Sequence, residues 1–480
     1  MTIERLIFNH SKTMPQKTAL IQGQSVVSYE QLWKEINKSA SWFKQRVEQG
    51  DRVIISASKN IEFVFTYFGA HLAGMICVPI DPETNETRLR RIIEVAQPKL
   101  IVGELRNHGE YEVIPFGDVS SEVESSEVES EFDFPIESNV ADLLFTTGTT
   151  GLPKGVALTF ANQMAAADNI NTFVGNTADD IEMLALPISH SFGLGRLRCV
   201  FAIGATLVLL GSFASMKKFY GEMERCHVTG FGMVPASWAY ILKMSGEKIG
   251  QFADQLKYIE IGSAFMSLEN KQMLMSLLPN THICMHYGLT EASRSAFISF
   301  HDDLDHLMSA GKPSPNTEIA VFSEQGKRLG RNEDGEICVK GRHVCSDYWG
   351  LPKEEFQKDL FDGFFRTGDW GHIDDEGYIH LISRKKEIIN VGGKKVSPNE
   401  VEEVLNGVDG IEESACVGAH DDVLGEVVKA FCVCSKEVDF EEIKKIMMKK
   451  LEVYKIPVLF ETIDALPKTQ NGKLQRLLLK

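Results

Sequence analysis

The 480-residue sequence predicts an α/β protein with a small α+β domain at its C-terminal end. Short β-branched apolar runs, such as Arg52–Ser56 and Leu100–Val102, alternate with stretches of helical period at residues 29–48 and Ile61–Leu72. This alternation is typical of a largely parallel sheet whose strands are joined by helices. Because a chain of this length exceeds what one compact core usually holds, we expect at least two domains.

The pattern changes in the last quarter of the chain. Residues 371–383 alternate around the turn signal Asp-Asp-Glu-Gly, which predicts a hairpin rather than a helical crossover. Farther on, Ser397, Pro398 and Glu400 occupy the N-cap, first and third positions expected of a helix that runs through Leu405. The last hundred or so residues therefore predict a separate small domain.

Composition excludes several classes of protein. A formal net charge of −17 argues against nucleic acid as the main partner. The nine cysteines include no Cys-x-x-Cys pair, and Cys432 and Cys434 are expected on one face of a strand, so we interpret all nine as free thiols of the cytoplasm. No apolar run reaches about 18 residues, so we expect no stable membrane insertion. The acidic tract at residues 120–131 predicts a solvated loop.

The most informative stretch is Thr-Thr-Gly-Thr-Thr-Gly-Leu-Pro-Lys-Gly at residues 146–155, which follows the apolar segment 142–145. Glycines let the backbone approach an anion, and threonine hydroxyls and successive amides can donate to phosphoryl oxygens. The P-loop pattern does not fit, because Lys154 is followed by Gly155 and not by Ser or Thr. We interpret the stretch as a strand that ends in a phosphate-binding loop; a flexible surface loop is the alternative.

Four further segments follow in order: Tyr-Gly-Leu-Thr-Glu at 287–291, Arg-Thr-Gly-Asp at 366–369, Ser-Arg-Lys-Lys-Glu at 383–387 and Pro-Lys-Thr-Gln-Asn-Gly-Lys at 467–473. Together with the first run, they resemble the motifs of the adenylate-forming superfamily, which holds acyl-CoA synthetases and other AMP-dependent synthetases and ligases, adenylation domains and luciferases. The resemblance spans residues 28–473. It implies that ATP activates a carboxylic acid as an acyl-adenylate, and that the acyl group then passes to a pantetheine thiol.

The same resemblance implies an architecture. The adenylation core would be residues 1–383, built of stacked α/β sheets with a small β-barrel-like subdomain. Residues 384–480 would form a mobile lid with a hinge near Lys386. Because Lys473 and Glu291 fall in different domains, the site would be complete only when the two domains close.

Each motif then implies residues for one part of the reaction. The expected phosphate ligands are Thr146, Thr147, Gly148, Thr149, Thr150, Gly151 and Lys154, with Thr290 at the α-phosphate. Glu291 offers magnesium a hard oxygen ligand. The expected adenosine contacts are Gly262, Ser263, Ala264, Tyr287, Gly288, Asp369 and Arg384. The expected thiol approach passes the hinge Lys386 and the pair Gly392 and Gly393.

Lys473 is the expected catalytic lysine, because a compact ammonium can bridge the carboxylate and the α-phosphate as negative charge gathers between them. Three of the charged candidates also have structural alternatives. Glu291 could be an acid at a helix N-terminus, Asp369 a turn residue and Lys473 a solvated lysine of a basic tail. The motif around each residue favours the functional interpretation. Phe265 stands where the family often has proline or glutamate, which leaves that wall of the adenine site undefined.

The acid is expected to be fatty or aryl. Residues 186–193 resemble the segment that borders the acyl pocket, where His190 gates the pocket or simply packs. No aspartate stands in this segment, which disfavours an α-amino acid, and the apolar wall at residues 231–237 suits an acyl or aryl group. Arg196 and Arg198 have three possible roles: one of them binds the second carboxylate of a dicarboxylic acid, one faces the thiol acceptor, or both lie on an exposed helix face. The role of Arg294 is open in the same way.

The acceptor stays open at this point. CoA and an acyl carrier protein present the same pantetheine, and the basic cluster Lys385, Lys386, Lys394 and Lys395 suits either. Luciferase-type oxidation and a non-catalytic nucleotide-binding scaffold are the other classes, and the intact charged positions disfavour the scaffold. A monomer and a homodimer are both compatible with the sequence.

Overall fold

The computed structural model describes residues 1–121, 133–147, 153–468 and 474–479. The chain forms two compact units. The first comprises Met1–Ile319 with Val339–Phe365, and the second comprises Ala320–Cys338 with Arg366–Lys480. The expected boundary between residues 383 and 384 lies inside the second unit. That residues 384–480 move as a lid about a hinge at Lys386 stays a prediction.

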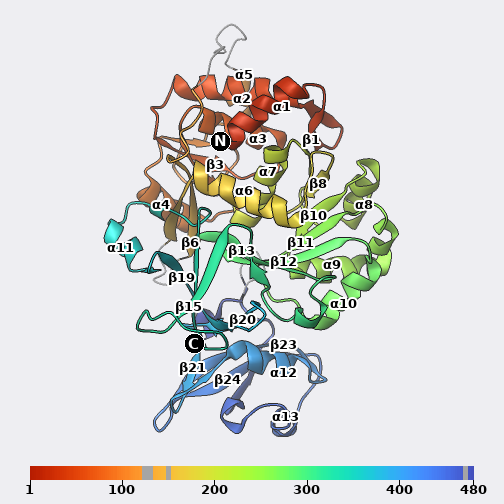
Figure 1. The fold of residues 1–480 in the computed structure, drawn as a ribbon, viewed down its shortest axis with the longest axis vertical. Helices are drawn as coiled ribbons and strands as arrows, with labels where there is room; N and C mark the ends of the chain where they lie inside the picture. The colour runs from red at the N-terminus through yellow and green to blue at the C-terminus, as the bar shows by residue number, and fades with distance from the viewer. Residues whose placement is uncertain (122–132, 148–152, 469–473, 480) are drawn as a thin grey trace. The chain divides into compact units, whose positions relative to one another are not determined.

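A nine-stranded sheet organises one half of the first unit, in the order β14-β13-β12-β11-β10-β8-β9-β1-β2 (Figure 1). The run from β12 through β1 is parallel, as the alternation of strands and helices predicted, and the pairs at both edges are antiparallel. The strands are β1 (Thr18–Gln22), β2 (Ser25–Ser28), β8 (Ile181–Leu184), β9 (Thr206–Leu209), β10 (Gly230–Met233), β11 (Tyr258–Ile261), β12 (His282–Leu289), β13 (Ala292–Ser299) and β14 (Lys312–Pro313).

A second, six-stranded sheet of the first unit has the order β17-β7-β6-β4-β3-β5. Its four strands β3 to β6 are parallel, whereas β7 pairs antiparallel with β6 and with β17. The strands are β3 (Arg52–Ser56), β4 (Ile76–Ile80), β5 (Leu100–Val102), β6 (Val140–Thr147), β7 (Pro153–Thr159) and β17 (Asp347–Tyr348).

Helices fill the space between these two sheets and cover their outer faces (Figure 1). One apolar core joins Ile55 of β3, Leu184 of β8 and Leu197 of α7, so α7 lies between the sheets. The helices are α1 (Ile3–Thr13), α2 (Tyr29–Lys44), α3 (Ile61–Leu72), α4 (Glu86–Ala96), α5 (Phe116–Ser121), α6 (Phe160–Val174), α7 (Ser191–Ile203), α8 (Met216–Arg225), α9 (Pro235–Ser245), α10 (Leu268–Leu277) and α11 (Lys353–Gln357).

Helix α2 shows how the local sequence sets these elements. The Ser28 side chain accepts a hydrogen bond from the Gln31 N–H while the Gln31 side chain accepts one from the Ser28 N–H, which satisfies two free donors at the helix start. Leu32, Ile36 and Phe43 then recur at helical spacing and are fully buried. The helix ends at Lys44, four residues before the predicted end of the periodic stretch.

A five-stranded sheet follows, in the order β15-β16-β19-β18 with β20 paired to β19. The expected barrel-like subdomain is thus an open sheet among the described strands. The predicted hairpin is confirmed, because β19 and β20 pair antiparallel from Asp369 opposite Arg384 to Ile373 opposite Ile379. The strands are β15 (Thr317–Phe322), β16 (Gly335–Gly341), β18 (Leu360–Phe361), β19 (Phe364–Ile373) and β20 (Ile379–Arg384).

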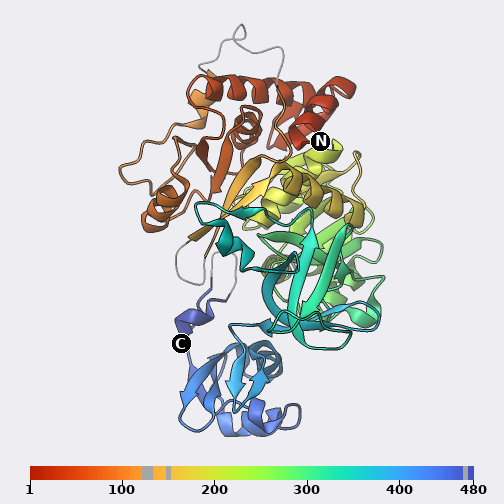
Figure 2. The ribbon, with the colours of Figure 1, turned by 60° about the vertical axis from the view of Figure 1, so that its left-hand side comes forward.

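The C-terminal sheet of the second unit, drawn in blue in Figure 2, has the order β22-β21-β24-β23 with β25 paired to β24. Ser397 caps the adjoining helix as predicted, accepting from the Glu400 N–H. All nine cysteines are free thiols, Cys432 and Cys434 among them. The elements are β21 (Ile389–Val391), β22 (Lys394–Val396), α12 (Pro398–Asn406), β23 (Ile411–Asp421), β24 (Gly425–Cys434), α13 (Phe440–Met447) and β25 (Leu459–Thr462).

Short 3₁₀ helices complete the described elements, at Gly246–Phe252, Leu304–His306, Val453–Lys455 and Arg476–Leu479. Within the ranges given above, no helix is both long enough and apolar enough to span a bilayer.

Candidate active site

The predicted phosphate-binding run begins and ends in two paired strands. Thr146 of β6 lies opposite Lys154 of β7, and Thr147 lies opposite Pro153. The predicted strand therefore leads into the run, and a second strand, which the sequence did not predict, begins at Pro153. The Lys154 ammonium lies 4.5 Å from the centroid of the Tyr348 ring, which holds it at the start of β7. Four of the predicted phosphate ligands lie outside the described residues: Gly148, Thr149, Thr150 and Gly151.

Thr290 and Glu291 form the turn between β12 and β13, where Leu289 pairs with Ala292. The helix-terminus alternative for Glu291 is therefore wrong, because the residue stands in a β-hairpin. The Glu291 carbonyl accepts a hydrogen bond from the Cys345 N–H at 2.7 Å, which fixes the turn. Burial, and then the charges of Glu291 and Asp359, raise the pKa of Tyr348. The Glu291 carboxylate is thus a hard oxygen ligand in a region of negative charge, and such a site suits a magnesium ion.

The predicted adenine-side residues directly follow β11. The Gly262 backbone passes beneath the His286 ring, and a Cβ at this position would lie 2.1 Å from His286 Cε1, so only glycine fits. Ser263 has φ of 73°, in the left-handed region. Because β10, β11 and β12 are parallel, their carboxyl ends share one edge of the sheet. That edge brings Gly262, Ser263 and Ala264 together with Tyr287 and Gly288.

The predicted ribose residues pair within the second unit. Asp369 of β19 lies opposite Arg384 of β20, and the Arg384 Nε is 2.8 Å from the Asp369 carboxylate. Arg384 also donates to the Thr367 carbonyl at 2.9 Å. The turn alternative for Asp369 is wrong, since the residue is in mid-strand and only 7% exposed. The arginine holds the carboxylate in one orientation, as recognition of a vicinal diol requires.

The remaining predicted residues of the second unit lie in turns. Exposed Lys386 is in the turn that follows β20, and Gly392 and Gly393 connect β21 to β22. The Gly392 N–H donates to the Leu424 carbonyl at 2.9 Å, so the turn is tied to the β23–β24 hairpin. Lys473, the predicted catalytic lysine, lies outside the described residues.

His190 is the N-cap residue of α7, and its side chain makes no capping hydrogen bond. Burial lowers the pKa of the imidazole; Asp81 raises it and Arg88 lowers it further. His190 is therefore neutral at physiological pH and stays a candidate for the pocket gate.

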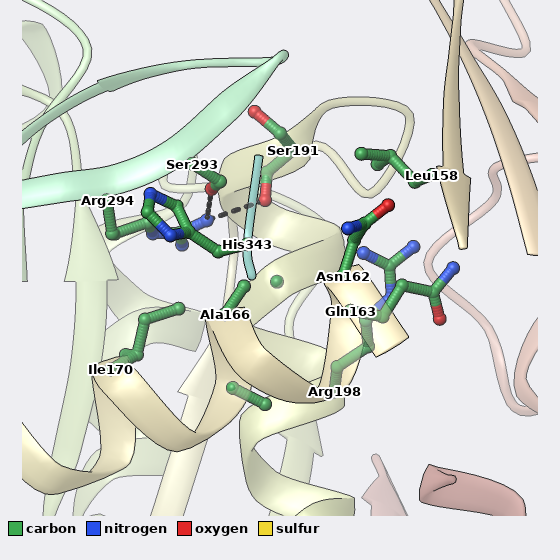
Figure 3. Close-up of a pocket in the computed structure, with 12 residues that line it drawn as sticks. Leu158, Asn162, Gln163, Ala166, Ile170, Ser191, Arg198, Ser293, Arg294 and His343 are labelled. Carbon is green, nitrogen blue, oxygen red and sulfur yellow. Dashed lines mark hydrogen bonds between the residues drawn. The ribbon is translucent and has the colours of Figure 1, made fainter. Parts of the chain in front are cut away.

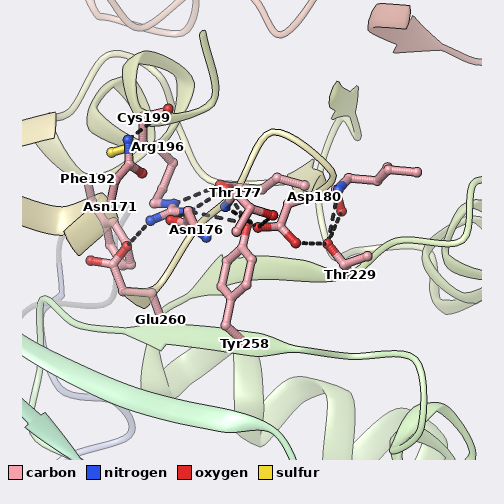
Figure 4. A network of polar contacts seen from close by, with 12 residues as sticks. Asn171, Asn176, Thr177, Asp180, Phe192, Arg196, Cys199, Thr229, Tyr258 and Glu260 are labelled. Carbon is pink, nitrogen blue, oxygen red and sulfur yellow. Dashed lines mark hydrogen bonds and ion pairs between the residues drawn. The ribbon is translucent and has the colours of Figure 1, made fainter. Parts of the chain in front are cut away.

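Arg196 is wholly buried in an ion-pair network, shown in Figure 4. Its guanidinium donates twice to the Glu182 carboxylate and reaches Glu260 at 3.1 Å. Further hydrogen bonds run to Asn176 at 3.1 Å and to the Tyr258 hydroxyl at 3.3 Å. The expectations of an exposed helix face and of a free cation for a second carboxylate are both wrong for Arg196.

Arg198 is buried as well, on another side of α7. It pairs with Asp142 of β6 and donates to the Tyr67 hydroxyl at 2.8 Å and 3.1 Å. His71, Cys77 and Asp142 have potential ligand atoms within 4.8 Å of one another, which raises the question of a metal site. Asp142 already has the Arg198 cation, and the two His71 nitrogens face Asp142 at 3.0 Å and Glu4 at 2.9 Å. These internal charges occupy the cluster, so we interpret it as structural.

Arg294 joins the Glu291 hairpin to the start of α7. Its side chain is 2% exposed and donates to the Ser191 carbonyl at 2.7 Å, to the Phe192 carbonyl at 2.8 Å and to Glu260 at 3.1 Å. Its backbone has φ of 57°, so both Ser263 and Arg294 hold strained left-handed conformations at this edge of the sheet. Arg294 therefore positions the segment predicted to border the acyl pocket.

Sequence reasoning missed Glu260 and His286. The His286 Nδ1 lies 2.6 Å from the fully buried Glu260 carboxylate. Burial would raise the pKa of Glu260, but Arg294, His286 and Arg196 hold it well below its ordinary range. A signal existed in the sequence, because Glu260 interrupts the apolar strand Tyr-Ile-Glu-Ile, where an unpaired charge is costly.

A small cavity lies between α6 and α7, lined among others by Gln163, Arg198, Arg294 and His343 (Figure 3). Its volume is about 20 Å³, which is room for about one water. It is therefore too small for an acyl group, and the carboxyl-end edge of the sheet is the better candidate.

Comparisons with known proteins agree with this geometry. The family model described as "AMP-binding enzyme" matches residues 7–349, and the model "AMP-binding enzyme C-terminal domain" matches residues 400–473. The chain belongs to the AMP-binding enzyme family. This AMP-binding enzyme is 30% identical over 473 residues to a 2-succinylbenzoate–CoA ligase of Bacillus licheniformis, covering 96% of each chain.

It is also 28% identical to a fatty acid–[acyl-carrier-protein] ligase of Streptomyces coeruleorubidus, covering 97% of this chain and 93% of the relative. A solved structure of O-succinylbenzoate coenzyme A synthetase from Bacillus subtilis, in complex with ATP and magnesium, superposes with a TM-score of 0.90 at 27% identity, covering 99% of this chain and 98% of that one. The chain is an AMP-forming acid–thiol ligase, with ATP and magnesium for the adenylation and a pantetheine thiol as acceptor.

Proposed function

We propose that this AMP-binding enzyme activates a fatty or aryl monocarboxylic acid and transfers the acyl group to CoA. The observation that supports a monoacid is the pairing of the arginines beside the predicted acyl segment. Arg196 is paired with Glu182 and Glu260, and Arg294 with Glu260 and two backbone carbonyls. A second carboxylate would meet guanidinium groups that are already neutralised, so its desolvation would go uncompensated.

The adenylation roles rest on the positions described above. Glu291 would hold magnesium, which supplies positive charge to the phosphates when bound. Asp369, oriented by Arg384, would accept hydrogen bonds from the ribose hydroxyls, and Lys154 would carry positive charge at the phosphates. Lys473 keeps its proposed role of neutralising the charge that develops between the carboxylate and the α-phosphate.

The preferred acceptor is CoA, and an acyl carrier protein is the second candidate. Two lysines of the basic cluster are already paired within the second unit: Lys385 lies 3.3 Å from Glu336 and Lys395 lies 3.3 Å from Glu324. These pairs weaken the positive field that would attract an acidic carrier protein. The fatty acid–[acyl-carrier-protein] ligase among the relatives keeps the second candidate in the experiment. We further place the enzyme in the cytoplasm, as a monomer or homodimer.

The test is pyrophosphate release from ATP and magnesium over fatty, aryl and dicarboxylic acids, with CoA or a phosphopantetheinylated carrier protein and with the thioester followed by mass. Sustained turnover with a monoacid and CoA is expected. Selective turnover of diacids would refute the monoacid proposal. An adenylate that passes only to the carrier protein would refute CoA as acceptor.

A further inference from the structure

The chain on the two sides of residues 469–473 is held together within the second unit. Lys468 and Leu474 pair in an antiparallel bridge, and the Gln475 N–H donates a hydrogen bond to the Pro467 carbonyl at 2.8 Å. The two flanks of the stretch that includes the proposed catalytic lysine therefore start from one fixed position.

Arg476 ties the second of these flanks to the rest of the unit. Its Nε lies 3.0 Å from the Glu387 carboxylate, and its two terminal nitrogens donate to the Glu402 carboxylate at 2.7 Å and 2.9 Å. The same guanidinium donates to the Asn399 amide oxygen at 2.7 Å. The side chain is only 10% exposed, so these contacts lie largely out of water, and a bidentate arginine–carboxylate pair has one rigid geometry.

The partners of Arg476 connect this flank to two other parts of the unit. Glu402 belongs to α12 and also accepts a hydrogen bond from the Cys416 N–H of β23 at 2.5 Å, so it joins the flank to the C-terminal sheet. Glu387 directly follows Lys386, the predicted hinge. One guanidinium therefore connects the chain beside the hinge, helix α12 and the flank of the catalytic segment.

We infer that Arg476 is the positioning residue of Lys473: it anchors the chain three residues beyond the lysine, so that the ammonium meets the carboxylate and the α-phosphate in one geometry while the adenylate forms. This inference rests on the proposed function. A lysine side chain has a flexible four-carbon stem, so where its ammonium lies depends on how firmly its backbone is anchored. A misplacement of about 1 Å can cost on the order of 100-fold in rate. Acyl transfer to the thiol does not use Lys473 in the proposed mechanism, so it should not depend on Arg476.

The experiment measures the two half-reactions separately: pyrophosphate release from ATP with the best acid, and thioester formation from supplied acyl-adenylate. Arg476→Gln should lower kcat for pyrophosphate release by about 100-fold, while the KM for ATP and the rate of thioester formation stay at their wild-type values. Arg476→Lys keeps the positive charge but cannot contact both carboxylates in the same fork geometry, so its loss should be smaller, about tenfold. That variant also tests the inference if Arg476→Gln does not fold.

Lys455→Gln is the matched control. Lys455 is 13% exposed and pairs with Glu400 of α12 at 2.6 Å and with Glu452 at 2.9 Å, but it lies in a 3₁₀ helix outside the catalytic segment. Both Lys455→Gln and Arg476→Gln remove a cation that two carboxylates share, so urea unfolding should show a loss of stability in each. Only Arg476→Gln should lose pyrophosphate release.

Wild-type pyrophosphate release by a folded Arg476→Gln or Arg476→Lys enzyme would overturn the inference. An equal loss of both half-reactions would also overturn it, because that is the result of a purely structural role. Either result leaves the ligase function standing. A wild type that unfolds cooperatively but releases pyrophosphate with none of the acids tested would refute the function and the inference together.

Discussion

Replacing Arg196 by leucine should destabilise the first unit without changing which acids the enzyme accepts. The guanidinium is fully buried and contacts Glu182, Glu260, Asn176 and Tyr258. In the variant, the Glu260 carboxylate still has its ion pair with Arg294 at 3.1 Å. Among these residues, the Glu182 carboxylate is left with only the hydrogen bond that the Tyr258 hydroxyl donates at 2.7 Å. Removing one partner of a buried ion pair costs about 3–5 kcal/mol, and we expect a loss in that range.

Urea unfolding measures this loss, as a lower midpoint at an unchanged slope. The control is Arg90→Leu, because Arg90 pairs with Glu86 at the surface with 56% and 52% exposure and should cost less than about 1 kcal/mol. An Arg196→Leu enzyme with wild-type stability, and with a KM raised for a diacid but not for its monoacid analogue, would show that Arg196 binds substrate.

Three further outcomes are expected. Asp369→Asn should raise the KM for ATP by about tenfold to a hundredfold, since a charged hydrogen bond is worth roughly 1.5–3 kcal/mol; Arg384→Gln, which leaves the carboxylate in place, should raise it less. Lys473→Ala should abolish pyrophosphate release yet spare thioester formation from supplied acyl-adenylate, and equal loss of both would contradict its role. Burial lowers the pKa of His343 to about 4. Between about pH 4 and pH 6.5, this histidine is therefore protonated less in the folded state than in the unfolded chain. The buried neutral ring therefore contributes about 3 kcal/mol to the free energy of unfolding above pH 6.5, and this contribution is lost as the pH falls to 4. The free energy of unfolding of the His343→Gln variant should decline less steeply than that of the wild type across this pH range.

The sequence predicted the parts of the fold that depend on local pattern. The parallel strands, the helix capped by Ser28 and the hairpin of β19 and β20 follow from period, capping and turn signals, all of which act within a few residues. These local signals could not predict whether the five-stranded sheet closes into a barrel or stays open, because closure depends on whether two edge strands that are distant in sequence pair. The phosphate-binding run shows the same limit: the strand that leads into it was predicted, but the second strand that begins at Pro153 and pairs Lys154 with Thr146 was not.

The arginines of α7 show why the site was harder to predict than the fold. Two charged residues at two-residue spacing usually mark an exposed helix face. In α7, every residue from Phe192 to Ala202 is buried, because the helix lies between two sheets and is surrounded by them. Arg196 and Arg198 therefore point to different buried carboxylates, Glu182 and Asp142, which come from different sheets. Only the packing of both sheets around one helix reveals these partners.

The buried charges also bear on how the site is held together. Ion pairs in a protein interior add little net stability, and well-packed apolar groups often replace them without loss, so stability alone is a weak reason for Glu260 to stand in an apolar strand. Glu260 contacts Arg196, Arg294 and His286 at once, and each of these connects to a different segment of the carboxyl-end edge. One carboxylate thereby fixes the start of α7, the Glu291 hairpin and the His286 ring together. Apolar replacements could restore the packing of this cluster, but they would not link these three segments through one charged group.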